Sequence, residues 1–275
     1  MPELPEAEIV ARQLRAELLG ATLADIWIGR DDIVREGLSS RRWYPQATVT
    51  AVERRGKSVV LVFSKGQHTR YLVAELGMTG LLLFNWAQGA YEKHTHVRLV
   101  FTGGRQPELR YWNPRRFGRV YLLDQRGLEA FTRRRFGYDP TTMSWLEFWS
   151  LLRQHRVRLK TFLLHQQFIA GIGNIYANEM LFRAGLHPHR RTHRVSRARA
   201  QGLYQQIHAV LAEAIEYGGS SIKDFVAPDG TKGRYAARHL VYDQALGSCP
   251  TNCGGTIRVL KSARTSFYCP RCQRA

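Results

Sequence analysis

The chain has 275 residues with 41 Lys and Arg against 22 Asp and Glu, a formal net charge of +19, and it is still 44% hydrophobic. This indicates a folded protein with a polyanionic partner, because phosphate backbones attract Lys and Arg. No apolar run is long enough to span a membrane, no signal peptide is present, and the four cysteines all lie within the last 27 residues, which argues against a secreted disulfide framework. We expect a monomer of the reducing bacterial cytosol or nucleoid, without membrane association.

The chain begins Met1-Pro2-Glu3-Leu4-Pro5-Glu6-Ala7-Glu8, a stretch with two interpretations. Removal of Met1 leaves Pro2 with the free α-amine, whose reference pKa of about 7.7–8.0 leaves an appreciable neutral fraction. A secondary amine that attacks a sugar C1′ gives an iminium, and Glu3 can move a proton to or from the sugar. Alternatively, prolines and acids simply begin a helix that runs to Gly20. Taken alone, the stretch favours the helix start.

Short apolar runs separated by Gly, Pro and charged residues come next. Their length and spacing predict a two-sheet β-sandwich or flattened barrel, with the first helix packed against one edge. The expected strands are Thr22–Ile28, Ala47–Val52, Val59–Phe63, Tyr71–Leu76, Leu81–Phe84, His96–Phe101 and Arg119–Leu123.

Three loops interrupt this β domain. Arg54–Lys57 is a basic turn. It is either a solvated hairpin tip or a turn that positions Lys57 in a functional site. Gly77–Gly80 is a glycine-flanked turn with an apolar tip. Asn113–Gly118 carries two arginines and an aromatic residue. Residue chemistry alone predicts that Phe117 is buried in the core and that one of the arginines binds a phosphate.

The pattern becomes helical from about Asp139. Aromatic residues and leucines recur at helical spacing, and a basic segment, Arg153–Lys160, leads into a helix expected over Lys160–Gln167. A Gly-x-Gly turn follows, and Asn174 is a natural N-cap for the next helix. This pattern predicts a helix–two-turn–helix motif, in which the N–H groups at the start of the second helix suit a phosphate. An ordinary helical hairpin is the alternative. A further helix is expected over Ser196–Tyr217, and a mobile loop over Ala227–Gly233.

The four cysteines form two close pairs around a short predicted β-hairpin. Three residues separate Cys249 from Cys253, and two separate Cys269 from Cys272. This arrangement predicts one structural, tetrahedral zinc ion with four cysteine ligands and no open position for water. Redox use is disfavoured because there are two pairs and no βαβ context. Basic residues around the cysteines, including Arg264, indicate that the finger contacts DNA.

Taken together, these stretches resemble the formamidopyrimidine-DNA glycosylase family, and the opening Pro2–Glu6 resembles its oxidised-purine branch rather than the endonuclease VIII branch. Each stretch is weak by itself, whereas their order and spacing are specific. The matching stretches are Met1–Glu8, Arg55–Lys57, Leu76–Gly80, Lys93–His96, Asn113–Gly118, Gly171–Glu179, Gly218–Phe225, Val241–Tyr242 and Arg264–Gln273.

The resemblance implies four catalytic residues. Pro2 would attack C1′ of the damaged nucleotide and hold it as a Schiff base, and Glu3 would act as general acid on the sugar. Lys57 would donate a proton for strand cleavage on the 3′ side. Arg264 would grip phosphate and assist the 5′ cleavage.

The resemblance also implies a set of DNA contacts. Met78, Arg115 and Phe117 would fill the gap left by the flipped-out base, with Arg115 facing the orphan cytosine, and this role for Phe117 reverses the core assignment. The stretch Ser220–Gly233 would fold over the lesion. Backbone contacts would come from His94, His155, Lys160 and Asn174, the partner within His155–Lys160 being open.

The resemblance therefore implies an α+β multidomain fold: residues 1–135 form a catalytic β-sandwich domain with an N-terminal helix, 136–238 a helix–two-turn–helix DNA-binding domain, and 239–275 a zinc finger. The function implied is a bifunctional DNA glycosylase and AP lyase of base excision repair, acting on duplex DNA with oxidised purines or abasic sites. The rivals are an oxidised-pyrimidine glycosylase and a non-catalytic zinc protein that binds damaged DNA.

Three departures from the family pattern bear on this reading. Glu75 stands where the family often has His, and Asp243-Gln244 stands where the family has Gly-Arg. At both places this chain therefore carries less positive charge than the family pattern. The first cysteine pair has one extra residue, which strains a tetrahedral site without abolishing it.

Overall fold

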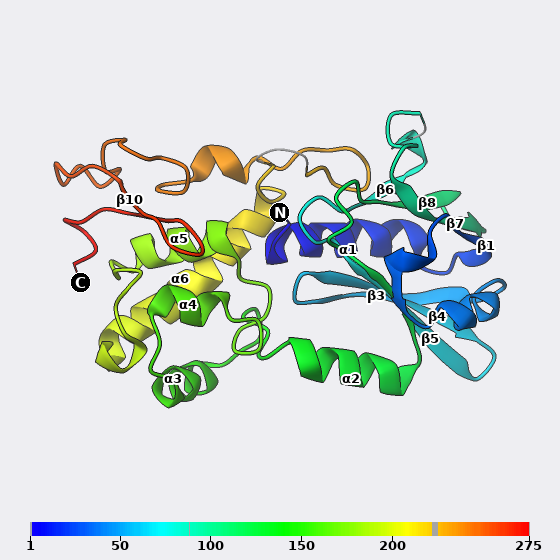
Figure 1. Cartoon of the computed structure of the whole chain (residues 1–275), viewed down its shortest axis with the longest axis horizontal. Helices are drawn as coiled ribbons and strands as arrows, with labels where there is room; N and C mark the ends of the chain where they lie inside the picture. The colour runs from blue at the N-terminus through cyan, green and yellow to red at the C-terminus, as the bar shows by residue number, and fades with distance from the viewer. Residues whose placement is uncertain (1, 88, 222–224, 275) are drawn as a thin grey trace. The chain divides into compact units, whose positions relative to one another are not determined.

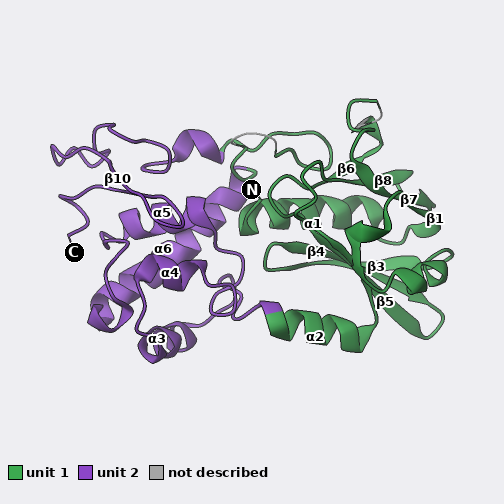
Figure 2. Cartoon of the chain, in the orientation of Figure 1, with its two compact units in different colours: residues 1–134, 218–234 green, residues 135–217, 235–275 purple. Residues whose placement is uncertain are grey.

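The computed structural model describes residues 2–87, 89–221 and 225–274, which divide into two compact units (Figures 1 and 2). Unit 1 comprises Met1–Arg134 and Gly218–Arg234, and unit 2 comprises Arg135–Tyr217 and Tyr235–Ala275. The three-domain division at 135/136 and 238/239 stays a prediction, while the compact units count residues 218–234 with the N-terminal part of the chain.

The first helix of unit 1, α1 (Leu4–Leu18), confirms the helix expected at the N-terminus. Its apolar side chains recur at helical spacing and form one buried face against β3 and β4. Leu14 and Leu18 are fully buried, and each contributes about 1.5–3 kcal/mol to stability. The chain turns into the first strand at Gly20, whose φ of +83° favours glycine.

Nine strands of unit 1 are hydrogen-bonded in the order β2-β9-β5-β4-β3-β1-β7-β8-β6. The link between β3 and β1 consists of the single pair Thr22 and Thr48, so the strands form two layers that meet at this corner and enclose one core. This arrangement confirms the predicted sandwich. The strands are β1 (Thr22–Ile28), β2 (Val34–Glu36), β3 (Thr48–Arg55), β4 (Ser58–Lys65), β5 (His68–Glu75), β6 (Leu81–Phe84), β7 (Thr95–Thr102), β8 (Glu108–Trp112) and β9 (Val120–Leu123).

The segment that follows residue 224 returns to unit 1 and is fastened there. Phe225 and Val226 are buried in the sandwich core, and Asp229 accepts a hydrogen bond of 3.0 Å from the Gln13 side chain of α1. The Pro228 carbonyl accepts a hydrogen bond of 3.0 Å from the N–H of Phe84. The stretch expected to be a mobile loop is therefore packed on α1 and β6, and residues 222–224 of the predicted lesion loop lie outside the described part.

The described part of unit 2 contains four α-helices. They are α3 (Trp145–Gln154), α4 (Leu159–Leu164), α5 (Asn174–Arg183) and α6 (Arg197–Glu216), preceded by α2 (Gln125–Arg135) at the end of unit 1. A capping box begins α3, since the Ser144 N–H donates to the Glu147 carboxylate at 2.8 Å and Ser144 Oγ accepts from the Glu147 N–H at 3.3 Å. The helix expected over Lys160–Gln167 ends earlier, at Leu164.

The C-terminal part of unit 2 is a hairpin of β10 (Arg258–Leu260) and β11 (Ser266–Tyr268). A small core of Phe182, Val241, Ile257 and Phe267 joins it to α5. The buried Glu179 carboxylate of α5 also accepts hydrogen bonds from the N–H groups of residues 240–242. Burial raises the pKa of Glu179, although these N–H groups act in the opposite direction. The hairpin is thus fixed to the helices.

Candidate active site

The N-terminal residues of unit 1 are buried around the start of α1. Pro2 is buried, and Glu3, at the N-cap position, is only 1% exposed. The Glu6 carboxylate accepts a hydrogen bond of 2.7 Å from the Glu3 N–H and another of 2.7 Å from the N–H of Ser220. Glu6 therefore ties Glu3, next to Pro2, to the segment that returns after α6.

A glycine is required beside this carboxylate. Gly219 has a φ of +78°, and a Cβ there would lie 2.7 Å from Glu6 Oε1. Sequence reasoning gave Glu6 no role beyond the opening motif. An acid at the third position of a helix that begins with an N-cap residue was the signal that could have identified it.

Lys57 lies in the two-residue turn between β3 and β4. The pair Arg55 and Ser58 closes this hairpin, and Gly56 supplies the positive φ of +58° that the turn needs. The Arg54 guanidinium donates to Glu8 of α1 at 2.9 Å and to the Gly56 carbonyl at 3.2 Å. Arg54 thereby anchors the turn that carries Lys57 to the first turns of α1, a role that the sequence did not reveal.

The Glu8 carboxylate is the other end of this anchor. It accepts hydrogen bonds of 2.8 Å from Arg12 and 2.9 Å from Arg54. Burial acts to raise the pKa of Glu8, but the two guanidinium groups outweigh it and hold the pKa below its ordinary value. The carboxylate is therefore charged at neutral pH.

The loops that carry Met78, Arg115 and Phe117 are packed against each other within unit 1. A Cβ on Gly77 would lie 2.4 Å from the backbone N of Gly118, so the two loops touch through their glycines. Met78 is 38% exposed and Phe117 is 59% exposed, with the Arg115 guanidinium 5.1 Å from the Phe117 ring centre. Residue chemistry placed Phe117 in the core, and this was wrong: the ring projects from the loop.

Asn113 organises the arginine-bearing loop. It is fully buried, its amide donates to the Tyr111 hydroxyl at 2.9 Å, and its Oδ1 accepts from the Arg116 N–H at 3.0 Å. Its own N–H donates to the carbonyl of His94 at 3.0 Å, and His94 has a φ of +79°. This constraint fixes the proposed DNA-contacting His94 next to the loop of Arg115.

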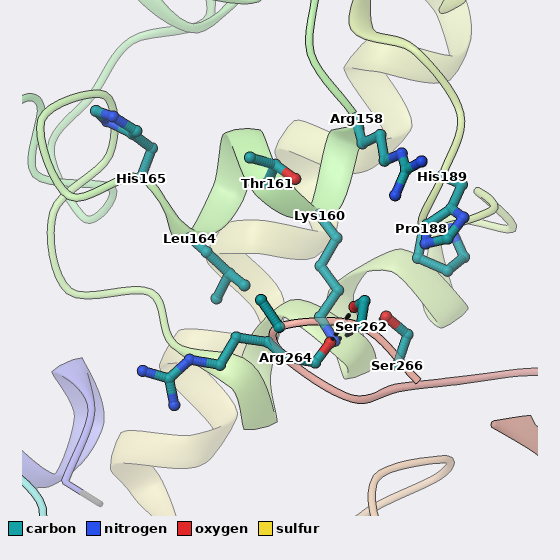
Figure 3. A pocket seen from close by; sticks show the side chains of 11 residues that line it. Arg158, Lys160, Thr161, Leu164, His165, Pro188, His189, Ser262, Arg264 and Ser266 are labelled. Atoms are coloured by element: carbon teal, nitrogen blue, oxygen red, sulfur yellow. Dashed lines mark hydrogen bonds between the residues drawn. The ribbon is translucent and has the colours of Figure 1, made fainter. Parts of the chain in front are cut away.

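In unit 2, Lys160 and Arg264 line a cavity of about 400 Å³ between α4 and the β10–β11 hairpin (Figure 3). Lys160 is only 5% exposed, and its ammonium donates to the carbonyls of Arg264 and Thr265 and to Ser266 Oγ at 2.9 Å. The Arg264 side chain points away from that ammonium (Figure 3). The other lining side chains include Arg158, His165 and His189.

His155 and Asn174 have different surroundings. The His155 ring stacks on Phe168 at 3.8 Å between ring centres, and the ring of His165 stacks on the same Phe168 at 4.0 Å. Gly173, rather than Asn174, occupies the N-cap position of α5, because Gly173 is extended and Asn174 is the first helical residue. Within the described chain, the Oδ1 of Asn174 accepts no hydrogen bond.

The four cysteine sulfurs converge within 4.8 Å of one another. The sulfurs of Cys249 and Cys272, and those of Cys253 and Cys269, are each 3.6 Å apart. A disulfide needs about 2.05 Å, whereas tetrahedral zinc with Zn–S bonds of about 2.3 Å places its sulfurs roughly 3.8 Å apart. The thiol groups therefore fit a structural zinc ion with four ligands.

The extra residue in the first cysteine pair is absorbed by the backbone. Asn252 takes a φ of +55°, and its N–H donates to the Cys249 carbonyl at 3.0 Å. Thr251 Oγ1 lies 3.2 Å from the sulfur of Cys249 and 3.1 Å from that of Cys272. The longer turn thus leaves the four sulfurs close together.

Two family sequence patterns match the chain. The "Formamidopyrimidine-DNA glycosylase N-terminal domain" covers residues 1–120, and the "Formamidopyrimidine-DNA glycosylase H2TH domain" covers residues 136–226. The chain belongs to the formamidopyrimidine-DNA glycosylase family. It is 41% identical to the formamidopyrimidine-DNA glycosylase of Solibacter usitatus over 100% of both chains. It is 39% identical to that of Thermomicrobium roseum over 99% of both.

Solved structures of the formamidopyrimidine-DNA glycosylase family have the same fold. The crystal structure of the Thermus thermophilus protein matches with a TM-score of 0.86 and 35% identity over 99% of this chain and 98% of the other. A Lactococcus lactis mutant in complex with Fapy-dG-containing DNA matches with a TM-score of 0.88 and 30% identity over 100% of both chains. The architecture predicted from the sequence is therefore confirmed for both units.

Glu75 departs from the usual pattern of the formamidopyrimidine-DNA glycosylase family, and the structure shows its partner. The Tyr121 hydroxyl donates to the Glu75 carboxylate at 2.8 Å, and the Tyr111 hydroxyl donates to the Glu75 carbonyl at 2.6 Å. Tyr121 is 3% exposed and Tyr111 is 2% exposed. The acid is thus held against the sandwich by two buried tyrosines.

Proposed function

We propose that this chain is a bifunctional DNA glycosylase and AP lyase that removes oxidised purines, such as 8-oxoguanine and formamidopyrimidines, in base excision repair. The observation that carries the proposal is full-length similarity, at 41% and 39% identity, to relatives named formamidopyrimidine-DNA glycosylase, in a chain that keeps Pro2, Glu3, Lys57 and Arg264.

The N-terminal amine is the proposed nucleophile. After removal of Met1, the Pro2 nitrogen would attack C1′ of the damaged nucleotide, the base would leave, and the C1′–N bond would become an iminium. Buried Glu3 would exchange a proton with the sugar as its ring opens. Loss of the 3′ phosphate by β-elimination and then of the 5′ phosphate by δ-elimination would cut the strand on both sides of the lesion.

The remaining site residues are proposed to handle the DNA around the reacting sugar. Lys57 would supply a proton for the first elimination, and Arg264 would hold a phosphate during the second. A base must leave the stack before its sugar can be attacked, at a cost of a few kcal/mol. The exposed Met78 and Phe117, with Arg115, would fill the gap, and His94, His155, Lys160 and Asn174 are the proposed backbone-contact positions.

Duplex DNA with damaged bases or abasic sites is the proposed partner. Support comes from solved relatives whose complexes contain THF or Fapy-dG DNA. The positive end of the α5 dipole, at Asn174, and the basic cavity around Arg264 are suited to phosphate. Among the described helices, none combines the length and apolarity needed to cross a membrane.

The test begins with the intact mass, which must show loss of Met1. The protein is then mixed with a duplex containing 8-oxoguanine opposite cytosine, and borohydride is added to reduce any iminium. We expect a covalent adduct that disappears in Pro2→Gly and in a form that retains Met1. Tight, salt-sensitive binding without an adduct would overturn the 8-oxoguanine assignment.

A second candidate substrate is an oxidised pyrimidine. One solved relative, from Lactococcus lactis, is described as a complex with oxidised-pyrimidine DNA, at 29% identity and a TM-score of 0.87. Trapping on a matched duplex with an oxidised pyrimidine separates the two preferences. If neither lesion is trapped although both duplexes bind, a non-catalytic protein that binds damaged DNA becomes the better conclusion.

A further inference from the structure

A group of exposed arginines lies in unit 2, outside the proposed catalytic residues. We call Arg153, Arg156, Arg191 and Arg194 the arginine surface; all four are exposed. Two of them come from the end of α3 and the segment after it, and the other two flank or belong to the 3-10 turn η4 (Thr192–Arg194). Segments about 35 residues apart in sequence thus contribute to one surface.

Buried contacts hold these two segments side by side. Thr192 is fully buried, its N–H donates to the Val157 carbonyl at 2.9 Å, and its hydroxyl donates to the His155 carbonyl. Arg158 and Arg191 form an antiparallel β-bridge. The arrangement is therefore set by the fold rather than by flexible side chains alone.

The guanidinium groups gather around His193. Arg153 donates to the His193 carbonyl at 3.2 Å, and Arg191 donates to the Arg156 carbonyl at 3.3 Å. Burial and the positive charges of all four arginines lower the pKa of the His193 imidazole.

Few acids are available to neutralise this surface. Between residues 148 and 212 the sequence has one acid, Glu179, which is buried and bonded to the backbone of residues 240–242. In unit 2, Glu213 is itself paired with Arg183 and Arg238. The basic residues of the same stretch are Arg153, Arg156, Arg158, Lys160, Arg183, Arg190, Arg191, Arg194, Arg197 and Arg199.

The arginine surface is continuous with the cavity that holds Arg264. Arg158 lines that cavity and is bridged through its backbone to Arg191, whose side chain reaches Arg156. Arg158 and His189 lie together on one side of this cavity (Figure 3). An anionic chain bound at Arg264 could thus continue over Arg158 onto the arginine surface without meeting an acidic side chain of this stretch.

We propose that the arginine surface binds backbone phosphates of the undamaged duplex beside the lesion, beyond the phosphate that Arg264 holds. Guanidinium groups match phosphate geometry with two parallel donors, and a row of them suits a regular polyanion. The inference rests on the proposed function, since it takes duplex DNA as the partner. Continuity with the Arg264 cavity favours DNA over an acidic membrane surface.

The test compares two duplexes with the same central abasic-site analogue, one of about 10 base pairs, roughly one helical turn, and one of about 30. The variant is Arg156→Gln/Arg191→Gln/Arg194→Gln. Its matched control, Arg41→Gln/Arg42→Gln/Arg126→Gln, removes the same charge from exposed positions of unit 1. The melting temperature of each variant shows that it is folded.

We expect the triple variant to bind the long duplex about tenfold or more weakly than the control, with less than about a twofold change on the short one. On the long duplex, log K falls as log salt rises. The magnitude of this negative slope should be smaller by about 3 in the variant, one unit for each phosphate that the variant no longer neutralises. Equal binding by variant and control on the long duplex would overturn the inference. Equal weakening on both duplexes would also overturn it, by placing the arginines at the lesion.

Three further outcomes separate this inference from a membrane-binding role and from the proposed chemistry. Normal long-duplex binding by the variant together with lost sedimentation on phosphatidylserine vesicles would assign the surface to a membrane instead. Wild-type protein that binds both duplexes but is never trapped by borohydride would contradict the proposed chemistry while leaving the arginine surface measurable. A wild type that binds neither duplex would overturn both.

Discussion

Lys160 holds the hairpin that carries Arg264 by donating from its buried ammonium to the Arg264 carbonyl at 3.3 Å, to the Thr265 carbonyl and to Ser266 Oγ. An ammonium has three donors, and these contacts occupy all of them. The contacts make Lys160 a positioning residue for Arg264. The sequence resemblance, by comparison, implies a direct backbone contact with DNA, which stays a prediction.

Replacement of Lys160 by methionine should therefore act through Arg264. Three oxygen atoms lose a charged donor, which is expected to cost about 1.5–3 kcal/mol in free energy of unfolding. Affinity for an abasic-site duplex should fall as it does in Arg264→Gln. If Lys160 acts through Arg264, the double variant should be little worse than either single one in a double-mutant cycle. Fully additive losses would show that the two residues bind DNA independently.

Gly118 permits the close packing of the two loops that carry Met78 and Phe117. A Cβ there would lie 2.0 Å from the Glu75 carbonyl oxygen and 2.3 Å from the Tyr111 hydroxyl. Gly118→Ala should therefore destabilise the protein by about 1–3 kcal/mol, measured by urea unfolding, and weaken binding to lesion duplexes. Gly202→Ala is the control, because nothing lies within 4 Å of the new methyl group in the middle of α6. Helix propensity predicts that this change stabilises by up to about 1 kcal/mol.

Phe117 should matter for base eviction and little for folding. Because its side chain is 59% exposed, Phe117→Ala should change the free energy of unfolding by less than about 0.5 kcal/mol. Aromatic stacking on bases is worth about 1–3 kcal/mol, so trapping on an 8-oxoguanine duplex should slow about tenfold or more. Trapping on an abasic site, which has no base to evict, should slow less. Leu146→Ala, also at an exposed residue (70%), should leave both rates unchanged.

The elements with clear apolar patterns were predicted from the sequence, and those without were not. The strands Thr22–Ile28 and Leu81–Phe84 have the predicted bounds. By contrast, β2 has three residues, β8 mixes Glu108 and Arg110 with its apolar side chains, and α2 buries only Leu128 and Phe131. Such segments offer few apolar side chains, so tertiary contacts decide their structure.

The site was predictable only where a residue type carries its own chemistry. The cysteine spacing is of this kind, whereas the Pro2-Glu3 opening alone favours a helix start, and its catalytic role stays a prediction from the resemblance. The anchoring roles of Glu6, Arg54 and Asn113 depend on partners distant in sequence, such as Ser220 for Glu6, and no local pattern specifies such partners. Phe117 was misplaced for the same reason, since a short segment does not show which face of a loop is buried.

Removal of zinc should unfold the C-terminal hairpin first. Cys253→Ser is expected to lose the metal, measured by atomic absorption, because four thiolates provide the whole site. Amide exchange should then rise in β10 and β11 while the β-sandwich of unit 1 stays protected. Thr251→Val is the matched control: it keeps all four sulfurs and should retain one zinc, with affinity lower by about 10–100-fold. Unchanged exchange in β10 and β11 after metal loss would contradict a structural zinc.

The ion pair of Glu8 with Arg54 should make stability depend on pH. Arg54 is 7% exposed and Glu8 is 18% exposed, and the guanidinium groups of Arg54 and Arg12 hold the pKa of Glu8 below its ordinary 4.5. A lowered pKa in the folded state means stability that is present above pH 4.5 and is lost as the pH falls through the folded pKa. Glu8→Gln should therefore cost about 2 kcal/mol at pH 7 in urea unfolding, and less as the pH falls below 4.5.

The control for Glu8 is Glu36→Gln. Glu36 is 48% exposed and pairs with Arg134 at 3.8 Å, so solvent screens it and little stability should be lost at any pH. Because Arg54 also holds the turn of Lys57, Glu8→Gln should slow strand cleavage more than base release, whereas Glu36→Gln should change neither. If Glu8→Gln lowers the free energy of unfolding equally at pH 7 and well below pH 4.5, the charge of the carboxylate is not what stabilises the contact between Glu8 and Arg54.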